Sequence, residues 1–453
     1  MTPESLQLVV VGVVAVAGLV AAVVWAKVHP FVALLAVAIG TGLAAGMPPD
    51  RVITAISGGM GSTLGSVAVV VGLGSMFGAM LEESGGAGQL ASALIKLCGP
   101  GRTWVALAAV GFLVCIPVFL DVAFVMLLPL AAAAARRTGG GVTSLALPML
   151  AGMAITHAFV PPTPGPTAVA VLVGADLGWV IAMGIAAGVP TLAVAATVAV
   201  KLLAPLAPGR TVDRPPASLP TEARRPPPLG VVVALLVMPL VLIVGDTAAR
   251  AAVGDTATTR WLALLGHPFT ALLAATLASF WLLGSRLGMP AAEVQRIAER
   301  SLEPAGTILL VTGAGGVFKQ VLVDSGAGRA VAESLASAAL PPLVVAWIVA
   351  AVIRLLQGSA TVAMITAAGL VAPLVAAAGR PEPFPALVTI AIAAGGTIAS
   401  HVNDSGFWLV SRYLGLSVRD TLRTWTVLET VIAVSGLAWV LLIAAACGGS
   451  PRP

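Results

Sequence analysis

The sequence predicts an all-α polytopic membrane protein built from two inverted-topology repeats, on the basis of its composition, its apolar runs and its internal repetition. Of the 453 residues, 58% are hydrophobic and 9% are charged, whereas a soluble domain carries roughly 25% charged residues. Apolar runs of about 18 residues or more recur along the chain, and a run of that length can cross a bilayer as a helix. The net charge of +5 is spread without a basic cluster, so it indicates membrane topology and not nucleic-acid binding.

Short motifs of the first half return in the same order in the second half. The matching pairs are HPFVALLA from His29 and HPFTALLA from His267, GMP from Gly46 and from Gly288, GLGSMFGAMLEESGGAG from Gly72 and GAGGVFKQVLVDSGAG from Gly313, and Thr156-His157 and Ser400-His401. Because the offsets stay between 238 and 244 residues, these matches predict two structural repeats.

The repeats are joined by a proline-rich stretch, PLAPGRTVDRPPASLPTEARRPPPLG, at residues 205–230. It has no hydrophobic periodicity, which is typical of an exposed linker. Its four arginines predict a cytoplasmic location. We therefore expect an N-terminal transmembrane repeat over residues 1–204, a cytoplasmic linker over 205–230, and a C-terminal inverted repeat over 231–453.

The charge distribution predicts the inversion. The first seven residues contain no Lys or Arg, so the N-terminus is expected outside. Loops near Asp50 and Asp176 in half one carry few bases, whereas their counterparts in half two are basic. Those counterparts carry Arg286, Arg296 and Arg300, and Arg412, Arg419 and Arg423. Each half-one loop is thus expected outside and its counterpart inside, with an odd number of crossings per half and both termini external.

Each repeat is predicted to hold about five transmembrane helices, a re-entrant hairpin and a broken helix. The run Thr103–Ala135 is too long for one crossing, and Pro117 and Asp121 interrupt its middle; this predicts the hairpin, with two short crossings as the alternative. Half two has a similar run at 343–378, centred on QGSAT. The spans of half one lie near residues 6–26, 29–46, 60–81, 143–173 and 178–204. The first is a full span with no basic region before it, so we expect no removable signal peptide.

Two polar stretches interrupt apolar spans, ITHAFVPPTPGPTA at 155–168 and IASHVNDSGFWL at 398–409. Proline cannot continue a helix, and Gly165 leaves room for a close approach of the backbone. Irregular backbone inside a membrane is tolerated only where it is buried in protein or lines a cavity. In secondary transporters such broken helices meet near the midplane and direct helix N-termini at an anion. The two breaks and the two hairpin tips are therefore expected to converge on one substrate cavity.

The side chains at these breaks are candidates for substrate binding. Hydroxyl, amide and imidazole groups suit a hydroxylated substrate, and a guanidinium can bind a carboxylate through two hydrogen bonds. Arg354 is the sole base of the second hairpin; its alternative role is to neutralise Asp121 or Asp404. The predicted substrate-binding residues are Thr163, Thr167, Arg354, Ser359, Thr361, His401, Asn403 and Ser405.

Asp121, His157 and Asp404 are the candidates for a titrating role, which the family resemblance given below implies is proton coupling. Acids within membrane spans are costly and therefore functional by default, and a histidine titrates near neutral pH. The alternatives are structural hydrogen bonds and ordinary core packing, and Glu429 is interpreted as a contact between packed helices. Among the candidates Asp121 is preferred, because no other charged residue lies in its hairpin. Cys98, Cys115 and Cys447 show no metal-binding spacing, so neither a metal ion nor a cofactor is expected.

Several stretches resemble the gluconate permeases of the GntP family: GSTLGSVAVVVGLGSMFGAMLEESGGA, IPVFLDVAFVMLLPL, THAFVPPTPGPTA, GADLG, GSATVAMITAAG and SHVNDSGFWLVSRYLGLSVRDTLRTWTVLET. The resemblance implies proton-coupled uptake of gluconate or a related sugar acid across a bacterial inner (plasma) membrane. Small hydroxy acids such as D-serine or glycerate are the alternative substrates. The family is similar to the wider ion-transporter superfamily, which implies re-entrant hairpins, a homodimer and an elevator motion. The family often has glutamate where this chain has Asp121, and histidine where it has Thr163.

An intramembrane hydrolase and a channel are the two alternatives to a transporter. An intramembrane hydrolase would use the histidines or acids, but neither HExxH nor GxGD occurs and no serine lies in a nucleophile motif. A channel would line its pore with rings or repeated filters, whereas paired broken helices favour alternating access. The chain is therefore predicted to be a transporter and not an enzyme.

Overall fold

The computed structural model describes residues 3–24, 26–138, 141–206, 226–253, 256–327, 330, 341–401 and 404–447, and these form helices without any strand. The expected linker falls largely outside the described residues. The elements of the first half are α1 (Pro3–Val24), α2 (Pro30–Ala44), α3 (Pro49–Glu83), α4 (Gly86–Cys98), η1 (Pro100–Arg102), α5 (Thr103–Val114), α6 (Leu120–Thr138), α7 (Val142–Phe159), α8 (Pro164–Val173), α9 (Leu177–Val198), η2 (Ala199–Leu203) and η3 (Ala204–Leu206).

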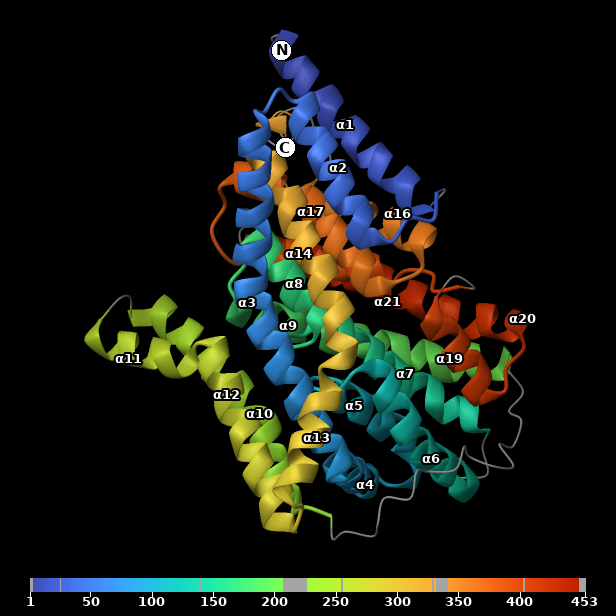
Figure 1. The fold of residues 1–453 in the computed structure, drawn as a ribbon. Helices are drawn as coiled ribbons and strands as arrows, with labels where there is room; N and C mark the ends of the chain where they lie inside the picture. The colour runs from blue at the N-terminus through green and yellow to red at the C-terminus, as the bar shows by residue number, and fades with distance from the viewer. Residues whose placement is uncertain are drawn as a thin grey trace.

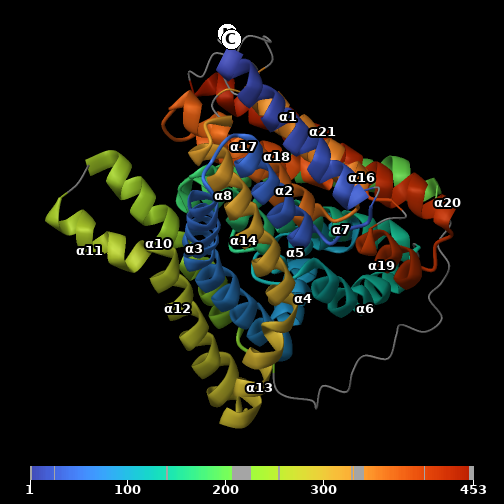
Figure 2. The same cartoon turned by 45° about the horizontal axis from the view of Figure 1, so that its top comes forward.

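The second half begins with α10, and its helices follow the same order. They are α10 (Leu229–Val253), α11 (Ala257–Gly266), α12 (Pro268–Ser279), η4 (Phe280–Gly284), η5 (Ser285–Leu287), α13 (Ala291–Ser301), α14 (Glu303–Asp324), α16 (Pro342–Gln357), α17 (Ala360–Ala378), α18 (Phe384–Thr397), α19 (Ser405–Leu414), α20 (Val418–Thr421), η6 (Leu422–Thr426) and α21 (Val427–Ala446). Figures 1 and 2 show α10, α11 and α12 projecting from the body as an arm, with α6 and α19 at the opposite edge of the body.

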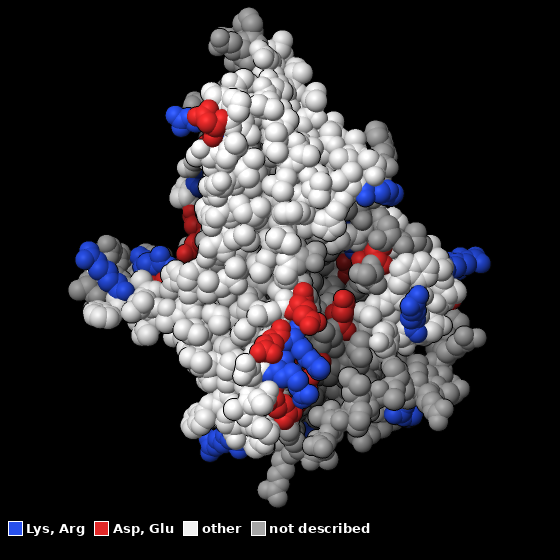
Figure 3. All heavy atoms as spheres, viewed as in Figure 1, with Lys and Arg blue, Asp and Glu red and all other residues white. Residues whose placement is uncertain are grey.

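The described helices confirm the predicted helical membrane fold. Seven are long and apolar enough to cross a bilayer, and five shorter apolar helices accompany them. Each span expected in half one corresponds to a helix or to the broken pair α7–α8. On the face shown in Figure 3 most of the surface is uncharged, because the side chains that would face lipid are apolar.

The sequence repeat has a structural counterpart in the caps of the helices. His29 and His267 each occupy the position before a helix that begins with proline, and each Nδ1 accepts a hydrogen bond of 3.3 Å from the phenylalanine amide two residues later. Gly46 and Gly288 also match, with φ of 83° and 84°, a left-handed conformation that side chains with a Cβ avoid. The matched motifs therefore preserve local geometry as well as composition.

The long helices α3 and α14 lie side by side and run in opposite directions (Figures 1 and 2). The two termini and the beginning of α3 lie at one end of the molecule, and α10 begins at the other end (Figure 1). This arrangement agrees with two halves of opposite orientation. Which end faces the cytoplasm remains the prediction of the charge pattern.

The two predicted hairpins are pairs of helices joined by short turns. Helix α5 has 12 residues and α6 has 19, and α16 and α17 have 16 and 19. A helix of 12 residues is about 18 Å long, which is shorter than the roughly 30 Å of the hydrocarbon core. Helix α5 is thus too short for a full crossing, which favours the re-entrant alternative over two crossings.

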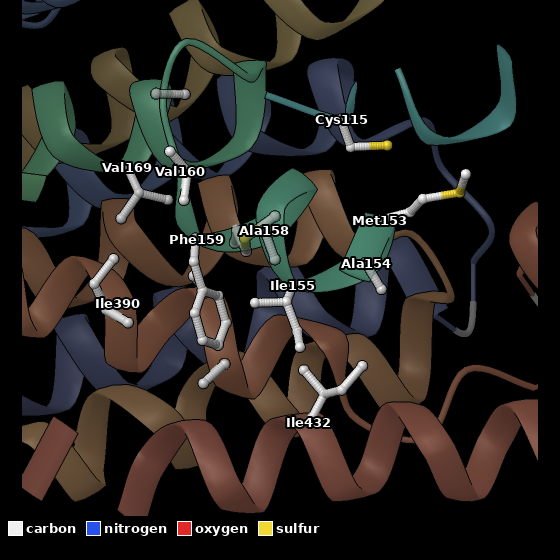
Figure 4. Packing of buried hydrophobic residues seen from close by; sticks show 14 of the residues in the cluster. Cys115, Met153, Ala154, Ile155, Ala158, Phe159, Val160, Val169, Ile390 and Ile432 are labelled. Atoms are coloured by element: carbon white, nitrogen blue, oxygen red, sulfur yellow. The ribbon is translucent and has the colours of Figure 1, made fainter. Parts of the chain in front are cut away.

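Small residues let the interior helices pack closely. A Cβ on Gly111 of α5 would lie 2.1 Å from the carbonyl oxygen of Met149, and one on Gly152 of α7 would lie 2.1 Å from that of Ala108. Packing through glycine is the usual way in which membrane helices approach each other. In Figure 4, Ile155 and Phe159 near the end of α7 point toward Ile432 of α21. This contact fixes the end of α7, where His157 lies.

Candidate functional site

A cavity of about 360 Å³ lies where the interrupted helices meet. It is bordered by the tip between α5 and α6, the end of α7, the tip between α16 and α17, the break between α18 and α19, and the last helix. Its apolar and aromatic border consists of Phe119, Leu120, Ala154, Ala158, Ala360, Gly406 and Trp425. The volume is within the range of sites for small molecules.

Three helix N-termini border this cavity. Asp121 is in the first turn of α6, Ser359 is the N-cap of α17, and Asp404 is the N-cap of α19. The Ser359 hydroxyl accepts a 3.4 Å hydrogen bond from the Val362 amide, and Asp404 Oδ1 accepts one of 3.1 Å from the Gly406 amide. Helix N-termini carry partial positive charge, so this arrangement favours an anionic ligand.

A buried ion pair joins the two interrupted elements of half two. Arg354 is 3% exposed, and its Nη2 donates to Asp404 Oδ2 at 2.5 Å. The Ser400 hydroxyl also donates to Asp404 Oδ2 and accepts a 2.7 Å hydrogen bond from the Trp425 indole. Asp404 therefore has acceptor contacts at both oxygens. Arg354 Nε and Nη1, by contrast, are buried without a hydrogen-bond partner among the described residues.

Six of the predicted site residues line the cavity: Asp121, His157, Arg354, Ser359, Thr361 and Asp404. Asp121 is exposed to it, and His157 is half-buried, with a ring Nδ1 that has no partner in the described part of the chain. The sequence therefore located Asp121, Arg354 and Asp404, because each of these charged residues interrupts an apolar stretch.

Three of the remaining predicted residues, Thr163, Thr167 and His401, do not line this cavity. Thr163 is buried, and its hydroxyl donates at 2.7 Å to the Val160 carbonyl in the same break. Thr167 is completely buried on α8, and Gly165 beside it faces Met364, whose Cε would lie 2.6 Å from a Cβ on this glycine. Neither Thr163 nor Thr167 lines the cavity, so the α7–α8 break contributes to it through the end of α7, at His157 and Ala158.

The α18–α19 break contains His401 and the last two predicted residues. His401 is half-buried, and its Nδ1 lies 2.8 Å from the Ala399 carbonyl oxygen, so the ring packs against its own turn. Asn403 lies outside the described residues, and Ser405 begins α19 with a side chain that is also outside them. Their assignment to substrate binding stays a prediction.

Sequence reasoning missed Glu429, Trp425 and Thr397, which also line the cavity. Glu429 is the only charged residue of α21, and it faces the cavity instead of serving only as a contact between helices. The isolated acid in an apolar span was the available signal. Thr397, by contrast, is one of many threonines, and its hydroxyl donates to the Ala394 carbonyl.

A second cavity of about 200 Å³ meets the first at Phe119. Its border combines three glutamates and two arginines from α3 and α13, namely Glu82, Glu83, Glu293, Arg296 and Arg300. Figure 3 shows acidic and basic side chains gathered at this hollow, over α13. Phe119 thus borders both the polar cavity and the charged hollow.

A helical membrane bundle whose interrupted helices enclose a polar cavity defines a membrane transporter and not an enzyme. The model of the GntP family permease matches residues 6–446. The low-affinity gluconate transporter of Escherichia coli strain K12 is 40% identical over 95% of this chain and 97% of its own. The gluconate permease of Pseudomonas aeruginosa is 38% identical over 95% and 96%. The chain therefore belongs to the GntP permease family, and it is a multi-pass protein of the bacterial inner membrane.

Two solved transporters share the fold at low identity. The YdaH transporter of Alcanivorax borkumensis superposes with a TM-score of 0.61, at 17% identity over 93% of this chain and 99% of that one. MtrF of Neisseria gonorrhoeae gives 0.62, at 14% identity over 91% and 94%. These similarities support a transporter fold and carry no information about the substrate.

Proposed function

We propose that this protein imports gluconate or a related sugar acid together with protons, by alternating access of the elevator type. Membership of the GntP family supports a gluconate-type substrate, because related chains include gluconate transporters and an L-idonate transporter of Escherichia coli. The chemistry of the central cavity supports the same substrate class independently.

The main observation behind the proposal is that two nitrogens of Arg354, Nε and Nη1, lack a hydrogen-bond partner among the described residues. Its guanidinium is buried beside the cavity, one nitrogen is bonded to Asp404, and two have no partner among the described residues. A buried N–H without an acceptor is costly, and a carboxylate is the acceptor that a guanidinium binds best. A sugar-acid carboxylate at this position would satisfy those donors.

Hydroxyl groups beside Arg354 suit the remainder of a sugar acid. Ser359 and Thr361 lie on the α17 side of the cavity, and both can donate and accept hydrogen bonds. Gluconate carries hydroxyls along its chain, so one end would bind Arg354 while the hydroxyls contact these side chains. D-serine and glycerate have the same groups on a shorter chain and are the alternative substrates.

The charges around the cavity favour the entry of a proton with the substrate. Three carboxyl groups, Asp121, Asp404 and Glu429, face one guanidinium, Arg354. An anionic substrate adds another negative charge in a site of low dielectric constant, where like charges interact strongly. Protonation of one acid offsets that charge. Asp121, His157 and Asp404 are the predicted proton-coupling residues, and Glu429 joins them as a cavity acid.

The division of the fold into a body and a projecting arm supports the predicted homodimer and elevator motion. The hairpins and broken helices that border the cavity belong to the body, and the arm of α10 to α12 projects from it into the space where lipid or a second protomer would lie (Figure 2). Movement of the body against a dimer that is held together by the arms would carry the cavity between the two sides of the membrane.

Uptake into proteoliposomes tests the proposal. Purified protein should accumulate labelled gluconate when the pH is lower outside than inside, and unlabelled sugar acids should compete better than D-serine or glycerate. Accumulation without a dependence on the pH gradient would remove proton coupling from the proposal. Transport of D-serine or glycerate in preference to every sugar acid would show that the substrate is a small hydroxy acid and not a sugar acid.

A further inference from the structure

Glu429 is an acid at a position of the last helix where packing does not require one. Directly before this helix the two halves are related by 241 residues, because Gly174 and Gly415 end α8 and α19 and Asp176 and Ser417 cap the helix that follows. At that separation the counterpart of Glu429 in half one is Gly188, so the repeated position does not require an acid. An acid in this otherwise apolar membrane helix is costly, and the cost indicates a role other than packing.

The geometry of Glu429 distinguishes it from the other two acids of the cavity. It is 4% exposed, and its Oε1 is buried without a hydrogen-bond partner among the described residues. Asp404 has acceptor contacts at both oxygens, and Asp121 is exposed to the cavity. A buried carboxylate oxygen without a donor strongly disfavours the ionised group. Among the three acids, Glu429 is thus the one whose surroundings suit the neutral form.

The charged and titratable groups that face Glu429 come from four elements. Arg354 of α16 and Asp404 at the start of α19 act on it electrostatically, and His157 of α7 and Asp121 of α6 border the same cavity. Helices α9 and α18, which also pack against α21, contain no titratable residue. Arg423 of η6 and Lys201 of η2 are exposed. The partner that matters is therefore Arg354, the only positive charge within the cavity.

We propose that Glu429 takes up the transported proton and that its protonation frees Arg354 for the substrate carboxylate; this deepens the proposed proton-coupled import and rests on it. Ionised Glu429 and the substrate carboxylate are both anions, and they compete for the electrostatic interaction with the Arg354 guanidinium. A proton from solution converts the carboxylate to a carboxylic acid, and the substrate anion then replaces it as the second negative group beside Arg354. One proton and one monoanion enter together, so the charge of the site is the same before and after loading.

The test compares Glu429→Gln with the wild-type chain in proteoliposomes. The amide keeps the size of the side chain and cannot bind the transported proton. For one proton per anion, a pH difference of one unit supports about tenfold accumulation. We expect wild type to approach this ratio, and we expect Glu429→Gln to exchange internal for external gluconate but to reach a ratio of about one. Glu303→Gln on the exposed start of α14 is the matched control and should behave as wild type.

Three measurements separate coupling from a structural role. Gluconate affinity of wild type should fall up to about tenfold per pH unit above the titration of Glu429, whereas that of Glu429→Gln should be independent of pH. Glu429→Asp should restore pH-driven accumulation, because it restores a carboxyl group. Calorimetry of wild type in buffers of different ionisation enthalpy should show uptake of one proton per gluconate, and this result does not depend on whether the variants fold.

The outcomes distinguish the two proposals. Wild type that transports gluconate without response to pH contradicts the proposed function. Wild type that responds, together with a Glu429→Gln variant that still accumulates gluconate with the same pH profile, overturns the role of Glu429 alone. Absence of proton uptake on binding between about pH 5 and 9, a range that contains shifted carboxyl and histidine groups, also overturns it.

Discussion

Arg354 and Asp404 are 50 residues apart in the chain and form a buried ion pair in which Nη2 lies 2.5 Å from Oδ2. The pair joins the tip of the second hairpin to the first turn of α19, so both interrupted elements of half two are held at the cavity together. Since Asp404 uses only one nitrogen of Arg354, the same guanidinium can hold the break and still bind a ligand.

Replacement of Arg354 should weaken substrate binding more than replacement of a hydroxyl. Hydrogen bonds to a charged partner contribute about 1.5–3 kcal/mol, and neutral ones about 0.5–1.5 kcal/mol. We therefore expect Arg354→Gln to raise the Kd for gluconate by roughly 10-fold to 150-fold, and Thr361→Val by roughly 2-fold to 10-fold. Binding to purified protein measures both, with Arg412→Gln on the exposed part of α19 as control. If both substitutions raise the Kd equally, Arg354 does not bind the substrate carboxylate and acts only as the counter-ion of Asp404.

Removal of Asp404 should destabilise the fold. Asp404→Ala leaves the buried guanidinium of Arg354 without its one ion-pair partner, and loss of one member of a buried pair costs about 3–5 kcal/mol. The free energy of unfolding in detergent should fall by that order, whereas Asp324→Ala at the exposed end of α14 should change it little. A decrease below about 1 kcal/mol, typical of a surface pair, would show that the pair is accessible to water.

A polar cluster outside the membrane-spanning segments makes its own prediction. Glu382, in the loop between α17 and α18, accepts hydrogen bonds from the Asp176 amide at 2.7 Å and from the Ala386 amide at 3.2 Å. Thr247 and Arg250 of α10 contact the Asp176 carboxylate. The cluster therefore ties the loop before α9 to α10 and to the loop before α18.

Burial raises the pKa of Glu382 above its ordinary value. The folded state then binds this proton more tightly than the unfolded state, so its contribution to stability is greatest at low pH. That contribution is lost as pH rises from the unfolded pKa through the folded pKa. As pH rises across that window, the free energy of unfolding of wild type should fall relative to that of Glu382→Gln, because the amide does not titrate. A difference that is constant with pH, or that grows in favour of wild type, would contradict it.

The sequence predicted the helices well because their apolar runs are long, and it predicted Asp121, Arg354 and Asp404 because each charge lies in such a run. It could not predict the face of α21 on which Glu429 lies. That helix is apolar all round, so it has no periodicity to indicate a buried side. The π-helical segment η6 directly before it also shifts the register of side chains.

The α7–α8 break shows the same limit at shorter range. Its prolines predicted an interruption, and Thr163 lies in it as expected. The direction of its hydroxyl depends on the backbone carbonyl of Val160. Such a local hydrogen bond competes with any ligand contact and has no signature in the residue types.

Membrane orientation can be tested by cysteine labelling in intact cells. In a chain without its native cysteines, an impermeant reagent should label a cysteine at Asp50, at the beginning of α3, and should miss one at Arg224 in the predicted cytoplasmic linker. The physical reason is the bias of arginine toward cytoplasmic loops. Labelling at Arg224 without permeabilisation would reverse the orientation, and permeabilised cells, in which both positions should react, provide the control.

The last prediction separates Asp121 from Glu429 as the coupling residue. The sequence favoured Asp121 because an acid in apolar surroundings is suited to bind a proton near neutral pH. Both carboxyl groups border the cavity; the Asp121 side chain is exposed in the first turn of α6, whereas Glu429 is 4% exposed. If Asp121 only passes protons from the cavity to Glu429, Asp121→Asn should slow pH-driven uptake several-fold without changing the final accumulation ratio. Exchange of gluconate at equal pH should keep the wild-type rate. If Asp121→Asn instead exchanges normally but cannot accumulate gluconate, the coupling site is Asp121 and the assignment to Glu429 fails. Time courses of uptake in the same proteoliposomes give both the initial rate and the final ratio, so a single experiment decides between the two carboxylates.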